Sequence, residues 1–165
     1  MKLPDSEDWV LSPENAHPNA KALFSESFFW DGIDDSAPWG SDEGADALAA
    51  FRHAHEIDGS MPDPAGFARR YLGNKWRKHA LTNERNTVVL DSYSCANMAM
   101  IAIALGMILL HGYVPAELKI HGLEAIDREL RPNCFNRFGF PDERVRKLQI
   151  CRERLMQAAT KRQDH

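Results

Sequence analysis

The stretch from Ser92 to Ala116 constrains the fold most, because it contains no Asp, Glu, Lys or Arg. Within it, residues 98–110 are apolar on every face of a helix. A helix that is hydrophobic all round must be buried, either in a protein core or in a bilayer. A stripe of small residues spaced by three or four lets a neighbouring backbone approach closely: Cys95, Ala99, Ala102 and Gly106. We therefore predict that this segment is the central helix of a soluble α-helical domain.

The alternative is a transmembrane span. A spanning helix needs about 20 apolar residues. The apolar run at 98–110 is shorter than that, and the residues of the segment that precede it are partly polar. The flanking charges, Asp91 and Glu117, are acidic, and no nearby Lys or Arg sets an orientation. Tyr93 and Tyr113 lie where interfacial aromatic residues would, and they favour the alternative. We expect a soluble protein without a membrane partner.

The remaining pattern predicts an all-α fold, a single-domain helical bundle of about six helices around a buried central helix at 91–111. Residues 1–17 are expected to form an irregular N-terminal arm, and residues 18–162 the domain. Helical spacing and cap residues place the helices at about 18–30, 41–56, 65–80, 91–111, 115–130 and 141–159, with an aromatic-rich loop at 131–140. In the third of these helices, Gly73 is a residue that can bend or end the helix. Ser41 is a suitable N-cap, and Asp42 and Glu43 suit the first turn of the helix that follows. No segment predicts a strand.

The first twenty residues are acidic and contain prolines but no apolar run, so no secretory signal of the usual kind is expected. The three cysteines, Cys95, Cys134 and Cys151, are odd in number and form no CxxC pair. Reduced thiols are therefore expected, and the cytoplasm is the predicted compartment.

Charge is distributed unevenly along the chain. Residues 1–66 carry 14 acidic and three basic residues, whereas residues 67–165 carry 17 basic and 10 acidic residues. The two halves thus have net charges of −11 and +7 within a total of −4. A split of this size bears on association with partners. It is equally explained if the acidic half packs on the basic half within the molecule.

The most distinctive local feature is the turn at 31–46, which has six acidic residues and no basic one. Clustered carboxylates can present an anionic face to a basic partner or hold a divalent cation. The spacing does not match the calcium-binding D-x-[DN]-x-[DN]-G loop, so we expect no metal and no cofactor. The candidate partner-binding residues are Asp31, Asp34, Asp35, Trp39, Asp42, Glu43 and Asp46, with Trp39 or Trp30 as an apolar anchor.

No other constellation predicts a reaction, and no catalytic residue is assigned. HExxH, GxSxG and phosphate-binding glycine motifs do not occur. Basic residues cluster twice, at 69–85 and at 144–162, and the first cluster contains Tyr71 and Trp76. Such clusters can contact nucleic acid, but the acidic chain carries no known recognition motif, so nucleic acid is not the expected partner.

The segment FFWDGIDDSAPWGSDEGADAL, residues 28–48, resembles a segment near the start of small, mostly uncharacterised bacterial proteins. Proteins of that type include immunity partners of polymorphic or secretion-delivered toxins. The resemblance covers about one eighth of the chain and transfers no functional residue.

We therefore expect a cytoplasmic protein-binding protein, in the form of an immunity-type inhibitor. It would occlude a toxin with a basic surface that acts inside the cell, such as a nuclease. One alternative is an all-α metal-dependent enzyme that uses the carboxylates at 31–46. The other is a nucleic-acid-associated accessory protein that uses the basic half. Should the acidic turn not bind, the loop at 135–140 is the next candidate surface.

Overall fold

The structure is a computed structural model that describes residues 9–58, 63–74, 87–136 and 138–161. Within these ranges every regular element is helical and no strand occurs, which confirms the all-α prediction. The α helices number seven there, where about six were predicted. In chain order the elements are η1 (Pro13–Asn15), α1 (Pro18–Leu23), η2 (Ser27–Trp30), α2 (Asp42–Asp58), α3 (Pro64–Leu72), α4 (Thr87–His111), α5 (Ala116–Glu129), α6 (Pro132–Phe135) and α7 (Pro141–Gln157).

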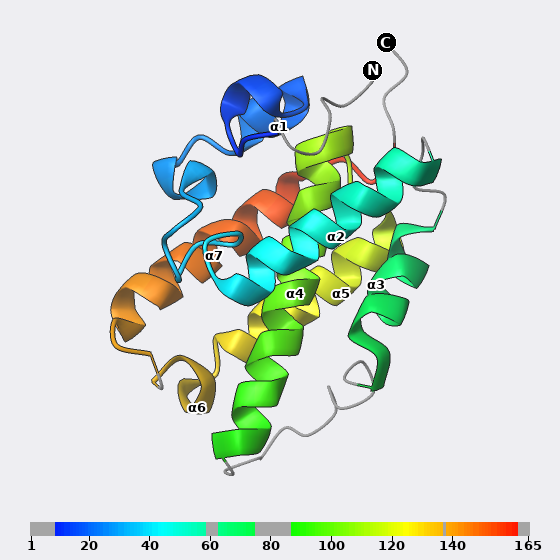
Figure 1. The fold of residues 1–165 in the computed structure, drawn as a ribbon. Coiled ribbons are helices and arrows are strands. Elements are labelled where there is room, and N and C mark those ends of the chain that lie inside the picture. The colour runs from blue at the N-terminus through cyan, green and yellow to red at the C-terminus, as the bar shows by residue number, and fades with distance from the viewer. Residues whose placement is uncertain (1–8, 59–62, 75–86, 137, 162–165) are drawn as a thin grey trace.

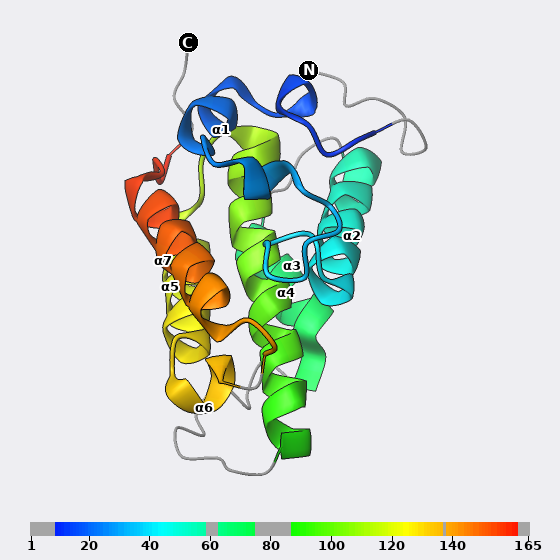
Figure 2. The ribbon, with the colours of Figure 1, turned by 90° about the vertical axis from the view of Figure 1, so that its left-hand side faces the viewer.

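Helix α4 is the centre of the bundle (Figure 1). It packs against α1, α2, α3 and α5, and α7 packs against α5. In the turned view, α2 lies on one side of α4 and α5 with α7 on the other, while α1 lies near the C-terminal end of α4 (Figure 2). Residues 101–110 are buried without exception. The predicted central helix is therefore confirmed.

The segment Asp91–His111 is long and apolar enough to cross a membrane by length and composition, but 89% of its most apolar window is buried inside the structure. Its apolar side chains are covered by the other helices. This is the pattern of a core helix in a soluble protein.

Small residues allow the helices to approach closely. A Cβ added at Gly106 of α4 would lie 3.1 Å from Leu48 Cδ1 on α2. A Cβ added at Gly122 of α5 would lie 2.7 Å from Ala104 Cβ on α4. Both distances are shorter than ordinary carbon–carbon contacts, so these two glycines set the spacing between α4 and its neighbours.

The N-terminal helix is shorter than predicted. Helix α1 ends at Leu23, and η2 follows after a break, whereas one helix over 18–30 was expected. The break lets Phe24 and Phe29 stack at 4.5 Å between ring centroids, and both are buried. On one continuous helix, residues five apart lie about 140° apart around the axis, so these rings could not share a pocket.

Three other boundaries differ from the prediction. Helix α4 begins at Thr87 and not at Asp91. Once a helix has formed, each added residue contributes another hydrogen bond, so the helix can extend beyond its apolar segment, and β-branched residues such as Val88 oppose this only weakly. Helix α3 ends at Leu72, before the full range of 65–80, because Gly73 adopts a φ of 53° at its C-cap; an end at this glycine was one of the two predicted outcomes. The expected continuation at 75–80 lies outside the described residues. The predicted loop at 131–140 contains the short helix α6.

The predicted division into an arm and one domain stays a prediction. Residues 9–17 of the expected arm contain η1, and residues 1–8 lie outside the described part of the chain. The described chain continues to Lys161.

Candidate functional site

The acidic turn forms an ordered loop between η2 and α2. Asp31 Oδ1 accepts a hydrogen bond from the Ile33 amide at 3.0 Å. Asp34 Oδ1 accepts hydrogen bonds from the Ser36 amide at 2.9 Å and the Ser36 hydroxyl at 2.6 Å. The Ala37 amide donates to the Asp34 carbonyl at 2.8 Å. Two of the six acids therefore have a local role, because aspartate side chains accept bonds from amides two residues later in turns.

Glycines close this loop tightly. A Cβ at Gly40 would lie 2.0 Å from the Asp34 carbonyl oxygen, and one at Gly44 would lie 2.1 Å from the Pro38 carbonyl oxygen. No other residue type fits such approaches of backbone to backbone. The glycines that predicted a turn are thus required by its packing.

Trp39 is part of the core and not of the surface. It is 2% exposed, and its Nε1 donates to the Ala102 carbonyl of α4 at 3.1 Å. In this conformation Trp39 therefore has almost no exposed surface that a partner could contact. Trp30 is partly buried against the core, and its Nε1 donates to the Phe24 carbonyl at 3.0 Å.

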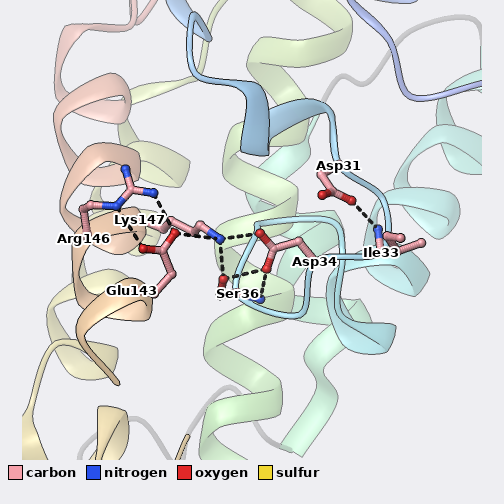
Figure 3. A network of polar contacts seen from close by, with 7 residues as sticks. All are labelled: Asp31, Ile33, Asp34, Ser36, Glu143, Arg146 and Lys147. Atoms are coloured by element: carbon pink, nitrogen blue, oxygen red, sulfur yellow. Dashed lines mark hydrogen bonds and ion pairs between the residues drawn. The ribbon is translucent and has the colours of Figure 1, made fainter. Parts of the chain in front are cut away.

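Lys147 of α7 binds the loop (Figure 3). Its Nζ pairs with Asp34 Oδ2, donates to Ser36 Oγ at 2.7 Å and lies 3.2 Å from Glu143 Oε1. The lysine side chain is 7% exposed, and that of Asp34 is 24% exposed. Burial raises the pKa of Asp34, but hydrogen bonds from Lys147 and Ser36 outweigh burial and hold that pKa below its usual value. Hydrogen bonds from Arg146 and Lys147 lower the pKa of Glu143 to about 2.

The seven predicted site residues therefore separate by environment. Asp34 is paired and Trp39 is buried, as described above. Glu43 is half-buried and accepts from Cys95 Sγ at 3.2 Å. In the described part of the chain no ion pair involves the remaining four, which are exposed: Asp31, Asp35, Asp42 and Asp46. The predicted cap is confirmed, since Ser41 Oγ accepts from the Gly44 amide at 3.2 Å.

Ile33 is the residue that the sequence analysis missed. It is 89% exposed, and it lies between the exposed Asp31 and the paired Asp34 in the loop. In Figure 3, Asp31 and Ile33 lie on the side of the loop away from α7. The signal in the sequence was a single branched aliphatic residue within a run of acids and turn-formers. Among the described residues, other large apolar side chains are exposed as well: Phe140 in the second candidate loop at 81%, Val10 at 64%, Ile120 at 54% and Met156 at 52%.

The basic residues of α7 all have carboxylate partners. The pairs are Arg144–Glu129, Arg146–Glu143, Lys147–Asp34, Arg152–Asp127 and Arg154–Glu26. In the other cluster Arg69 pairs with Glu117, while Lys75, Arg77, Lys78 and Arg85 lie outside the described residues. The pairs of Lys147 and Arg154 join the acidic half of the chain to the basic half, as does the more exposed contact of Arg70 with Asp63 at 4.0 Å.

No group of three or more His, Cys, Asp or Glu residues among those described could hold a metal ion. One hollow of about 290 Å³ lies between α1, the end of α4 and the end of α7, and its lining is mostly apolar. Polar side chains enter it from Asn19 and Gln157. A smaller cavity of about 20 Å³ lies behind the loop, between Ser36, Arg144 and Cys151. The first hollow contains none of the predicted site residues, and the second contains none either.

The chain is similar to the uncharacterized protein YfeS of Escherichia coli strain K12, with 29% identity over 133 residues that cover 75% of this chain and 54% of YfeS. The chain thus spans about half the length of the curated relative it matches. No protein-family model matches the chain, and no solved structure matches it. This similarity carries no function.

Proposed function

We propose that this chain is a protein-binding protein whose contact surface is the docking loop, residues 31–36, together with the exposed acids at the start of α2. In the form that the resemblance of residues 28–48 favours, it is an immunity-type inhibitor that occludes a basic toxin in the cytoplasm. Its partner is a protein with a basic surface around an apolar depression.

The observation that carries the proposal is Ile33. A large aliphatic side chain that is 89% exposed contributes almost nothing to the stability of the fold. The loop that presents it is nevertheless ordered by hydrogen bonds before and after this residue. Single exposed apolar residues are common on protein surfaces. What distinguishes Ile33 is the carboxylates that flank it in the loop, of which Asp31 and Asp35 are exposed.

Such a surface divides the work of binding between two kinds of residue. A buried apolar anchor at the centre of an interface supplies most of the binding energy. Charges around it steer the partner and orient it. Ile33 supplies the first function, and the exposed Asp31, Asp35, Asp42 and Asp46 supply the second.

Neither alternative has a particular observation in its favour. The exposed carboxylates do not converge on one point among the described residues. The basic side chains of α7 are all engaged by carboxylates of the same chain. A metal or a nucleic acid would have to use groups elsewhere.

The test is affinity capture from the organism of origin followed by measurement of Kd with the purified partner. Ile33→Ala should weaken binding by about 2 kcal/mol, or about 30-fold, as at an interface hot spot. Asp31→Lys with Asp35→Lys should weaken it further at low salt, because charges of like sign then meet at the rim.

Glu124→Lys with Glu153→Lys is the matched control, since it changes net charge equally at two exposed positions on α5 and α7. That control should bind like the wild type. If the Ile33 and Asp31 variants also bind like the wild type, the docking loop is not the interface, and the exposed Phe140 becomes the residue to test. For the immunity form, the captured partner should be an enzyme that this chain inhibits, with one molecule bound to one.

A further inference from the structure

We infer that Lys147 is a positioning residue that holds the docking loop in one conformation, with Ile33 directed outward, before any partner binds. The inference takes its purpose from the proposed function. The positioning itself is a property of this chain alone and can be measured without a partner.

The first argument comes from the donors of Lys147. An ammonium group has three donors and no acceptor, and three acceptors surround this one: Asp34, Ser36 and Glu143. Two of these belong to the loop and one to α7 itself. The aliphatic stem is buried, and Nζ lies 5.7 Å from the centroid of the Phe28 ring in η2. The lysine therefore has one position from which all its donors are used.

The second argument comes from the loop. Both oxygens of Asp34 are occupied, one by Ser36 and the other by Lys147. Within the described part of the chain, Lys147 makes the polar contacts that link residues 32–36 to another element. The other hydrogen bonds of these residues stay within the loop. Removal of the lysine side chain thus leaves residues 32–36 without a polar contact to α7, while Trp39 still anchors the following turn to α4.

Helix α7 also provides a matched control. Arg154 lies two helical turns beyond Lys147 and pairs with Glu26, which precedes η2. Both pairs are partly buried, with side-chain exposures of 7% and 24% for Lys147–Asp34 and 19% and 25% for Arg154–Glu26. Arg154 therefore joins the same two halves of the chain without contact to the docking loop.

The experiment is amide hydrogen exchange by NMR on the purified full chain. In Lys147→Met the amides of Ser36 and Ala37, which bond to Asp34, should exchange about 10- to 100-fold faster, as expected when a hydrogen bond to a charged group is lost. The amide of His17, which bonds to the Leu109 carbonyl, reports on the body of the bundle and should be unchanged.

Arg154→Met should leave Ser36 and Ala37 unchanged, and Lys147→Arg should slow their exchange relative to Lys147→Met. Equal acceleration at His17 and at the loop would overturn the inference, because it would mean global destabilisation. Unchanged exchange at Ser36 and Ala37 would overturn it as well, because the loop would then hold itself.

The two hypotheses fail separately. If the loop loosens as expected but Ile33→Ala leaves partner capture intact, the proposed function is refuted and the positioning role stands. If Ile33→Ala abolishes capture while Lys147→Met changes neither exchange nor association rate, the positioning role is refuted and the binding function stands.

Discussion

Glu129 offers the sharpest test of the core, because it is a fully buried carboxylate at the end of α5. Its side chain is 0% exposed and accepts from Ser94 Oγ at 2.9 Å, Asn97 Nδ2 at 2.9 Å and Arg144 Nη2 at 3.0 Å. Arg144 is itself 3% exposed. Glu129→Ala would leave one buried cation and two buried polar side chains without this acceptor.

The size of the loss follows from that arrangement. Removal of one partner of a buried ion pair costs about 3–5 kcal/mol, because the remaining charge stays in a poorly solvating environment. For a domain of this length, each kcal/mol lowers Tm by about 2–4 °C, so the expected drop is about 6–20 °C. Urea denaturation followed by circular dichroism measures the free energy of unfolding directly.

The control is the double variant Glu129→Leu with Arg144→Leu, which removes both charges. Apolar replacement of a whole buried pair is often close to neutral, so the double variant should be more stable than Glu129→Ala. A loss below about 1 kcal/mol for Glu129→Ala would refute the reasoning, since it would place the group at the typical value for a surface pair.

Three further predictions use other parts of the molecule. Gly122→Leu should lower the free energy of unfolding by about 1–3 kcal/mol, because even a Cβ there would lie 2.8 Å from Leu155 Cδ2; unchanged stability in urea would contradict the close packing of α5 on α7. Burial raises the pKa of Asp34, but its hydrogen bonds lower that pKa by more, so the folded-state pKa lies below the unfolded value of 3.8. The stabilising contribution of Asp34 is therefore present above pH 3.8 and is lost as the pH falls through the lower folded-state pKa. Asp34→Asn should therefore lower Tm at pH 7 and change it less near pH 3, and an equal drop at both would contradict this. Burial raises the pKa of Cys134 to about 11, so iodoacetamide at pH 8 should modify Cys134 only after unfolding, and rapid labelling of Cys134 in the folded chain would contradict it.

The fold could be predicted from the sequence where a residue pattern is compatible with only one structural environment. An apolar run with no charged residue over residues 98–110 must be buried, and the structure buries it. The break after Leu23 could not be predicted, because helical spacing of phenylalanines is satisfied by one helix or by two short ones. Stacking between Phe24 and Phe29 decides that choice, and stacking is a property of the packed core.

The candidate site shows the same limit. Six acids within sixteen residues predicted a surface feature, but charge counts cannot distinguish a solvent-facing carboxylate from one that pairs with a distant lysine. Asp34 pairs with Lys147, which follows it by 113 positions. An aromatic residue in a polar turn suggested an exposed anchor, yet Trp39 is held inside by a hydrogen bond to α4. Ile33, an aliphatic residue of the type usually found in a core, is 89% exposed instead.

The ion pairs of α7 explain part of the uneven charge of the two halves of the chain. Lys147 and Arg154 of the basic half form ion pairs with Asp34 and Glu26 of the acidic half, so part of the charge of each half is neutralised within the molecule. The acids that remain at Asp31, Asp35, Asp42 and Asp46 are exposed. Because exposed charges interact over about 10 Å at 0.1 M salt, the electrostatic field near this acidic segment comes from these exposed carboxylates and not from the net charge of the half. Association through residues 31–46 would therefore depend on the carboxylates that α7 leaves unpaired, of which Asp31 lies two residues before Ile33 and Asp35 two residues after it.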